Sequence, residues 1–439
     1  MVRRTISELF SGMVLAEDVR TPGGRFLMPR GTVLDTGHLK SLTAWNLDAV
    51  VVLGETAPGP AELEPPVAAT AGPAGTVGTN VLELATASVR ARFACFKPDS
   101  PAWAALTRLA LDREVRKRTA AGDAGAEEPW EDRSAPPGEA PAVVPPLTLE
   151  SLLRDEPKLV SPPEVYLRIN EVLRDPTSTV DDAADSIKHD PSLAAKLLRL
   201  VNSSYYGRTM RAMKGRFPAK VDSLSRAVLV VGARQLSTLA LGVSVLPLFQ
   251  DIPPKWVNMH LFWEHSVGCA VAAQAIAAAT GKANPETAFV AGLLHDFGRI
   301  LVFKQATPHI GAAMRRAEAE TEPLYLAERA VMGFDHAVLA GHLLQKWQFP
   351  VNLEKMVRCH HDPGDPIYTD EAAVIHLADV VATAMAWGGS GNRRTPALDD
   401  DAWQALGLTG DSLAALVPVM EDRLAETMRS FFPDHQGPP

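Results

Sequence analysis

The pattern of apolar and polar residues along the first 54 positions predicts short strands. Apolar and polar residues alternate there between turns that contain glycine or proline. Alternation of this kind, interrupted by turn residues, is typical of strands in a small sheet. The apolar runs lie at residues 12–16, 25–28, 31–34 and 48–52. A helical stretch is expected over residues 38–45. We therefore predict a small α+β module at residues 1–54.

Two segments after this module have little periodic apolar surface. Residues 55–80 and 120–146 are rich in Ala, Pro and Gly, and burial there cannot offset the entropy of ordering. Both are predicted to be linkers. Between them, residues 81–119 place leucines among Arg and Glu, which indicates one or two amphipathic helices. We expect these helices to pair with each other, with the domain that follows, or with a second protomer in a homodimer.

From residue 147 the apolar positions recur at helical spacing, and no comparable strand alternation appears. Thr179 and its polar neighbours are N-cap candidates for a helix over 183–187, and Asp190 followed by Pro191 predicts a helix that runs to Val201. The predicted fold is mainly α, an irregular bundle of many helices preceded by the α+β module. We place the main helical domain at 147–385 and a C-terminal helical extension and tail at 386–439.

Composition narrows the class of protein. The chain has 439 residues, of which 46% are hydrophobic and 22% charged, so several globular domains are expected. A net charge of −9 argues against a nucleic-acid binder, which needs a basic face. No run of about 18 uncharged apolar residues occurs, so we predict a cytoplasmic protein without a membrane partner. The three cysteines, Cys95, Cys269 and Cys359, are widely spaced and are expected to be buried thiols.

Motifs in the helical part carry a family resemblance. The run at 189–207, HDPSLAAKLLRLVNSSYYG, closely resembles the most distinctive motif of HDOD domains, which are bacterial signalling domains. Further matches lie at 222–236, 263–266, 292–299, 334–341 and 359–361. The resemblance covers roughly residues 150–385 and implies an α-helical fold of the HD superfamily. Residues 12–19, GMVLAEDV, resemble less strongly a module that precedes some HD-GYP phosphodiesterase domains.

Nine of the twelve histidines fall between His260 and His376. Hydrolases of the HD superfamily hold one or two metal ions through His and Asp side chains from successive helices. The resemblance therefore implies a ligand set of His265, His295, Asp296, His336, His360, His361 and Asp379. Such ligands suit Fe, Mn or Zn. In a hydrolase, Asp296 could bridge two ions and, with Arg299, would be a candidate catalytic residue.

The histidines also have a purely structural interpretation. His295 and Asp296 could simply hydrogen-bond each other and nearby helix ends in a polar core. Adjacent residues cannot share one helix face, so a common metal would require a helix end or a bend, which Gly292 and Gly298 could permit. Among the other histidines, His342 and His376 are expected to be structural, and His260 and His309 are expected to lie at the surface.

Two functional hypotheses follow. In the first, the protein is a regulatory output protein without enzymatic activity, whose HDOD domain binds a signalling partner or a small ligand. In the second, it is a metal-dependent phosphohydrolase that acts on a nucleotide or on a cyclic dinucleotide such as cyclic di-GMP. The HD-GYP enzymes have Lys where this chain has Arg299, and a Gly-Tyr-Pro signature where it has residues 362–368. Arg can still bind phosphate, but it is not equivalent to Lys. The missing Gly-Tyr-Pro signature and the Asn-Ser-Ser run at 202–204 favour the first hypothesis.

Overall fold

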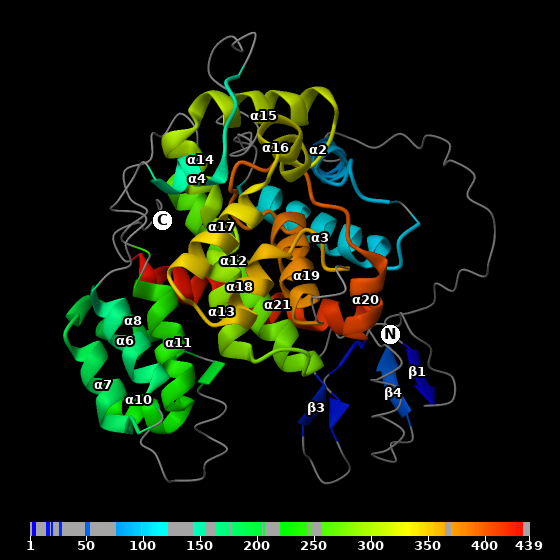
Figure 1. Cartoon of the computed structure of the whole chain (residues 1–439). Coiled ribbons are helices and arrows are strands. Elements are labelled where there is room, and N and C mark those ends of the chain that lie inside the picture. The colour runs from blue at the N-terminus through cyan, green and yellow to red at the C-terminus, as the bar shows by residue number, and fades with distance from the viewer. Residues whose placement is uncertain are drawn as a thin grey trace. The chain divides into compact units, whose positions relative to one another are not determined.

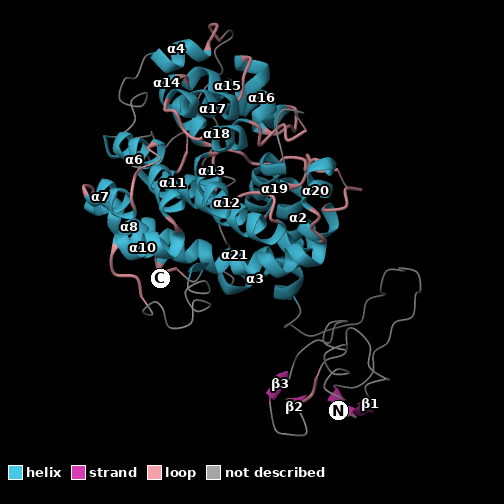
Figure 2. Ribbon diagram, turned by 60° about the horizontal axis from the view of Figure 1, so that its bottom comes forward, coloured by secondary structure: helices cyan, strands magenta, loops and turns pink. Residues whose placement is uncertain are grey.

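The computed structural model describes the chain as two compact units, residues 1–72 and 73–439. The residues described are 2–5, 15–17, 19–20, 26–28, 49–52, 76–97, 99–121, 144–154, 164–175, 177–203, 205–206, 220–244, 246, 257–364 and 370–432. Figure 1 and Figure 2 show their helices and strands. Each unit is considered by itself.

The first unit contains two antiparallel strand pairs. Strand β1 (Val2–Thr5) pairs with β4 (Ala49–Val52), with Val2 opposite Val52. Strand β2 (Val19–Arg20) pairs with β3 (Phe26–Met28) through an irregular register. The predicted strand at 31–34 and the predicted helix at 38–45 lie outside the described residues.

The second unit is helical, which confirms the predicted fold class. Its helices are α2 (Thr76–Arg92), α3 (Trp103–Ala121), α4 (Leu149–Arg154), α6 (Glu164–Arg174), α7 (Val180–Lys188), α8 (Pro191–Val201), α10 (Leu224–Val231), α11 (Ala233–Ser244), α12 (Met259–Thr280), α13 (Pro285–Leu294), α14 (Phe297–Gln305), α15 (Thr307–Ala319), α16 (Leu324–Met332), α17 (His336–Lys346), α18 (Val351–Arg358), α19 (Asp370–Ala384), α20 (Asp400–Leu406) and α21 (Gly410–Phe431).

Helix α12 lies in the middle of this unit in both views (Figure 1, Figure 2) and packs on α13, α19 and α21. Nearly all its residues from Phe262 to Ala277 are buried, as expected for a helix that is apolar all round. Helices α6, α7, α8, α10 and α11 pack together on one side of it, and α14, α15 and α16 pack together on another. A single core cluster connects these groups.

Local capping explains where the helices begin. The Asp190 side chain accepts a hydrogen bond from the Leu193 backbone N–H, and Pro191 occupies the first helical position, as the sequence predicted. Thr179 caps α7 in the same way. Asn258 caps α12, and Gly281 ends it in the left-handed conformation.

The helices on either side of the family-like region join the same unit. Helix α2 begins at Thr76, five residues before the predicted start at 81, and α3 ends at Ala121. Both pack on each other, and α3 also packs on α19 and α21. Arg92 donates a hydrogen bond of 2.8 Å to the carbonyl oxygen of Ala384. The homodimer contact predicted for these helices stays a prediction.

Within the described part of the chain, no single helix has the length and apolar character to cross a membrane. The helices α10 and α11, bent by 115° relative to each other, reach that length and apolar character only when they are counted together.

The thiols of Cys269 and Cys359 are buried and that of Cys95 is half-buried, and none of the three forms a disulfide.

Candidate metal centre

The seven predicted ligand residues come together from five places in the helical unit. They are His265 in α12, His295 and Asp296 between α13 and α14, His336 at the start of α17, His360 and His361 after α18, and Asp379 in α19. None of the seven is more than 6% exposed. Their ligand atoms form three overlapping groups, each compact enough to hold a metal ion.

The break between α13 and α14 lets His295 and Asp296 point into one centre. Helix α13 ends at Leu294 and α14 begins at Phe297, so the pair occupies the junction, as the sequence argument required. Gly298, however, has a different role from the one expected. It lies inside α14, where an added Cβ would meet the His336 carbonyl oxygen at 2.1 Å. This glycine allows α14 and α17 to approach closely.

On one side of the centre, two imidazoles face two carboxylates. The Nε2 atom of His265 lies 3.4 Å from Asp296 Oδ2 and 3.3 Å from Asp379 Oδ1. The Nε2 atom of His295 lies 3.4 Å and 3.7 Å from the same two oxygens. Four side chains from three elements therefore converge on one small volume.

On the other side, His336 contacts the second oxygen of Asp296, and two more histidines lie beside His336. The Nε2 atom of His336 lies 2.9 Å from Asp296 Oδ1 and 3.1 Å from the Nε2 atom of His361. The ring of His360 lies 3.9 Å from that of His361, measured between centroids. Asp296 thus faces histidines with both its oxygens, the position a bridging carboxylate would take between two ions.

Hydrogen bonds fix which imidazole nitrogens can bind a metal ion. His295 Nδ1 lies 2.7 Å from the Gly292 carbonyl oxygen, and His360 Nδ1 lies 2.7 Å from that of Val357. A carbonyl only accepts, so Nδ1 carries a hydrogen, and in the neutral imidazole Nε2 carries the lone pair. Both Nε2 atoms are buried without a hydrogen-bond partner, as is Nδ1 of His361. Lone pairs aimed into a cluster with carboxylates suit a divalent transition metal.

The carboxylates of the centre are held in their charged form. Burial raises the pKa of Asp296, but Arg299 and His295 outweigh it and hold that pKa well below its usual range. The pKa of Asp379 is also well below its usual range, because the nearby imidazoles of His265 and His295 outweigh burial. Two buried carboxylates kept ionised give the centre a strong attraction for cations.

The histidines divide into two classes. Burial lowers the pKa of His295, but the charge of Asp296 outweighs it and places that pKa well above the ordinary value. For His360 and His361 burial prevails, and neighbouring histidines reinforce it, so both pKa values lie well below the ordinary value. A metal would therefore find His360 and His361 already neutral, whereas it would displace a proton at His295.

Supporting residues that sequence reasoning missed surround the ligands. Glu328 in α16 is fully buried and accepts hydrogen bonds from the backbone N–H of His336 and from its Nδ1, at 2.9 Å and 2.5 Å. It also accepts one from Nε of Arg299 at 3.2 Å. Nothing marks Glu328 in the sequence except its place eight residues before a candidate ligand.

Arg299 is enclosed in this network. Its Nη1 donates to Asp296 Oδ2 at 3.1 Å and to the hydroxyl of Ser390 at 2.6 Å, and the residue is 1% exposed. The Ser390 contact lies beyond the predicted domain boundary at 385. In the conformation described, the guanidinium orients Asp296 and is shielded from any phosphate in solvent.

The remaining histidines are mostly structural. His376 Nδ1 lies 2.7 Å from the His360 carbonyl oxygen, and its Nε2 accepts a hydrogen bond from the Asp399 backbone N–H, so it joins α19 to both segments. The expectation that His309 lies at the surface is wrong, because it is 5% exposed and contacts the Pro145 carbonyl oxygen.

Comparison with known proteins finds a family model and a relative that match part of this chain. The family model of the HDOD domain matches residues 159–363. An uncharacterized protein of Treponema pallidum (strain Nichols) is 27% identical over 202 residues, 46% of this chain, and the chain spans 37% of that protein's length.

Two solved structures are among those similar to this chain. One is a protein from Shewanella amazonensis SB2B whose name assigns it provisionally to the phosphohydrolases. It is 23% identical and has a TM-score of 0.50, and the match covers 64% of this chain and 97% of that chain. The other, an HDOD domain protein of unknown function from Geobacter sulfurreducens, is 23% identical with 65% and 100% covered and a TM-score of 0.49. The first likeness shows a common fold.

Proposed function

Through residues 159–363 the chain belongs to the HDOD domain family, and on this premise we propose that it is a signalling regulator whose helical unit holds a divalent metal ion in the His/Asp centre. The observation that carries the proposal is the set of buried imidazole nitrogens without a hydrogen-bond partner, on His295, His360 and His361. A buried polar atom left without a partner costs about 1–3 kcal/mol. A single ion would satisfy several such atoms and neutralise the aspartates.

The burial of the centre supports a regulatory role over turnover. A phosphate ester must reach a metal-bound site directly, yet all seven candidate ligands are at most 6% exposed. The ring of Tyr325 stacks on His361 with centroids 4.0 Å apart, and Arg329 lies over Tyr325. In this proposal the ion fixes the shape of the helical unit, which then passes an input to a signalling partner.

Metal content is the direct test. Mass spectrometry on protein purified without a nickel-releasing resin should find Fe, Mn or Zn near one or two equivalents, and His295→Ala should lose most of it. Asp422→Ala, at an exposed position on α21, is the matched control and should keep the ion. A parent protein without metal, even after reconstitution with each ion, would contradict the metal centre.

A second candidate function, phosphohydrolase activity on a nucleotide or cyclic dinucleotide, has one observation in its favour. Both oxygens of Asp296 face histidines, an arrangement that suits two ions and an activated water. The protein from Shewanella amazonensis carries a name of this class. Hydrolysis of bis(p-nitrophenyl) phosphate or cyclic di-GMP by the metal-loaded parent, lost in Asp296→Ala, would establish it. Full metal occupancy without turnover would leave the regulatory function.

A further inference from the structure

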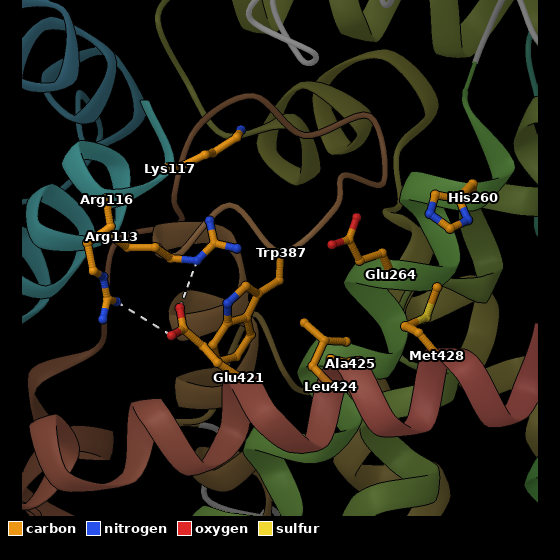
Figure 3. A pocket seen from close by; sticks show the side chains of 10 residues that line it. All are labelled: Arg113, Arg116, Lys117, His260, Glu264, Trp387, Glu421, Leu424, Ala425 and Met428. Carbon is orange, nitrogen blue, oxygen red and sulfur yellow. Dashed lines mark hydrogen bonds and ion pairs between the residues drawn. The ribbon is translucent and has the colours of Figure 1, made fainter. Parts of the chain in front are cut away.

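A second site lies on the helical unit, apart from the His/Asp centre. A cavity of about 490 Å³ opens between α3, α12 and α21 (Figure 3). None of the seven candidate metal ligands lines it. Of its walls, only the α12 residues His260 and Glu264 belong to the stretch that the family model matches. Its size lies within the range of about 300–1,000 Å³ typical of small-molecule sites.

One wall of the cavity is basic. Arg113, Arg116 and Lys117 stand at positions i, i+3 and i+4 of α3 and therefore share a face. Arg113 Nε lies 2.8 Å from Glu421 Oε1, and Arg116 Nη2 lies 3.5 Å from Oε2 of the same carboxylate. Among the ten residues drawn in Figure 3, Lys117 forms no ion pair, and its side chain reaches over the cavity. Three cations share this wall with one carboxylate.

The floor is apolar and contains one unused hydrogen-bond donor. Leu424 and Met428 of α21 line it beside the ring of Trp387. Trp387 is fully buried within the unit, yet its indole Nε1 has no hydrogen-bond partner. A buried indole N–H normally finds an acceptor, so its position at this cavity points to a ligand atom that accepts.

Glu264 stands opposite the basic wall and does not cancel it. Burial raises the pKa of Glu264 and outweighs the opposing effect of His260 and Arg113. A carboxyl group with a raised pKa is more readily neutral, and it can then donate a hydrogen bond. Even with Glu264 ionised, the three cations of the wall outnumber the carboxylates of Glu264 and Glu421, so the balance of charge in the cavity is positive.

We propose that this cavity binds a small organic anion. Its carboxylate or phosphate group lies between Lys117 and Arg116, and its ring or apolar chain lies on Leu424 and Met428. Such a ligand supplies the acceptor for the indole N–H and a counter-charge for the basic wall. Arg116 is 65% exposed in its side chain, so the acidic group has a route from solvent. The site joins a helix before the family-matched stretch to one after it.

The test uses three small probes of similar shape on the full chain: phenyl phosphate, benzoate and benzyl alcohol. Titration calorimetry and ligand-observed NMR should detect at least one of the two anions, with the neutral alcohol weaker by about tenfold or more. A preference between phosphate and carboxylate identifies the acidic group. In the ¹⁵N spectrum, the indole signal that disappears in Trp387→Phe should shift when the anion binds.

Charge reversal supplies the control. Lys117→Glu should weaken anion binding by about tenfold or more, whereas Arg108→Glu, at an exposed position on the same helix outside the cavity, should leave it unchanged. Both positions are exposed, so both variants should fold, which a thermal melt verifies. Equal binding of the alcohol and the anions, equal affinity in the two variants, or an unmoved Trp387 signal would each overturn the proposal.

Discussion

Two consecutive residues of α12, Glu264 and His265, face two regions of opposite character. His265 lies in the His/Asp centre, where every candidate ligand is buried, and its imidazole lies close to the carboxylates of Asp296 and Asp379. Glu264 lines the cavity between α3, α12 and α21, whose basic wall includes the largely exposed Arg116. Neighbours on a helix point about 100° apart, so one buried helix serves both regions.

The difference between the two regions lies in what a change of charge would do. In the centre, a lost charge leaves buried partners uncompensated, so the effect falls on the free energy of unfolding. At the cavity, solvent screens the exposed side chains, so the effect falls on the affinity for a ligand and hardly on the fold. Substitutions in the centre, with matched controls at exposed positions, test this difference through the free energy of unfolding.

The largest effect is expected for Asp296→Ala. The substitution leaves Arg299 and the facing histidines in the core without their carboxylate. Removal of one partner from a buried charged pair typically costs about 3–5 kcal/mol of unfolding free energy. Chemical denaturation measures it, with the exposed Asp422→Ala as control. A loss below about 1 kcal/mol would mean that the centre does not hold the fold together.

A smaller loss is expected for Gly298→Ala. The new Cβ would lie 2.1 Å from the His336 carbonyl oxygen, so α14 and α17 must move apart. Overpacking of this kind costs about 1–3 kcal/mol and would also shift His336 away from Asp296. The control is Gly364→Ala, which would meet no atom within 4 Å. Thermal melts of both variants compare them, and equal melting temperatures would contradict the close helix contact.

The metal-free protein should be most stable near pH 6.5. Folding raises the pKa of His265, His295 and His336, so their contribution is complete below the ordinary value of about 6.5 and is lost as the pH rises through their folded pKa values. Folding lowers the pKa of His360 and His361, so stability is lost as the pH falls below about 6.5.

Two further effects shape the dependence of stability on pH. The aspartates of the centre have lowered pKa values, so their contribution is present above about 3.9 and is lost as the pH falls through the folded values. A bound metal competes with protons for the imidazoles, so the stabilisation it adds should grow as the pH rises. Melting temperatures from pH 5 to 9, with and without Zn²⁺ or Mn²⁺, measure both trends. Metal stabilisation that shrinks with rising pH would contradict the histidine ligands.

The smallest effect is expected for Ser390→Ala. It removes the hydroxyl that accepts from Arg299 at 2.6 Å, and a hydrogen bond of this kind contributes about 1 kcal/mol or somewhat more. Ser192→Ala, at an exposed position on α8, is the control. If Ser390→Ala also weakens metal retention, the serine helps to orient Asp296 through the arginine. Unchanged metal content with lower stability would limit it to a packing role.

The sequence predicted the helical fold because its signals are local. Apolar spacing and caps such as Asp190 with Pro191 act within one or two turns, and the structure places α8 where they indicate. The junction at His295 and Asp296 was also foreseeable, since neighbours on a helix cannot share a face. The set of His and Asp residues predicted as metal ligands came from the resemblance to the HDOD family.

What the sequence could not predict depends on contacts between distant segments. Glu328 supports His336, and Ser390 supports Arg299 from 91 positions away, yet neither lies in a motif. His309 was placed at the surface because its partner, the carbonyl oxygen of Pro145, carries no side-chain signal. The cavity was likewise hidden, because α3 and α21 meet only after the chain has folded around α12.

The position of Asp379 in the sequence limits how short a functional piece of this helical unit can be. The family model ends at residue 363, but this aspartate, which faces His265 and His295, comes sixteen positions later in α19. A recombination event that transplanted only the matched stretch would deliver half of the carboxylate pair and none of the loop that holds Arg299. A piece transplanted by engineering would have to extend at least to Ser390 to keep both carboxylates and the Arg299 contact.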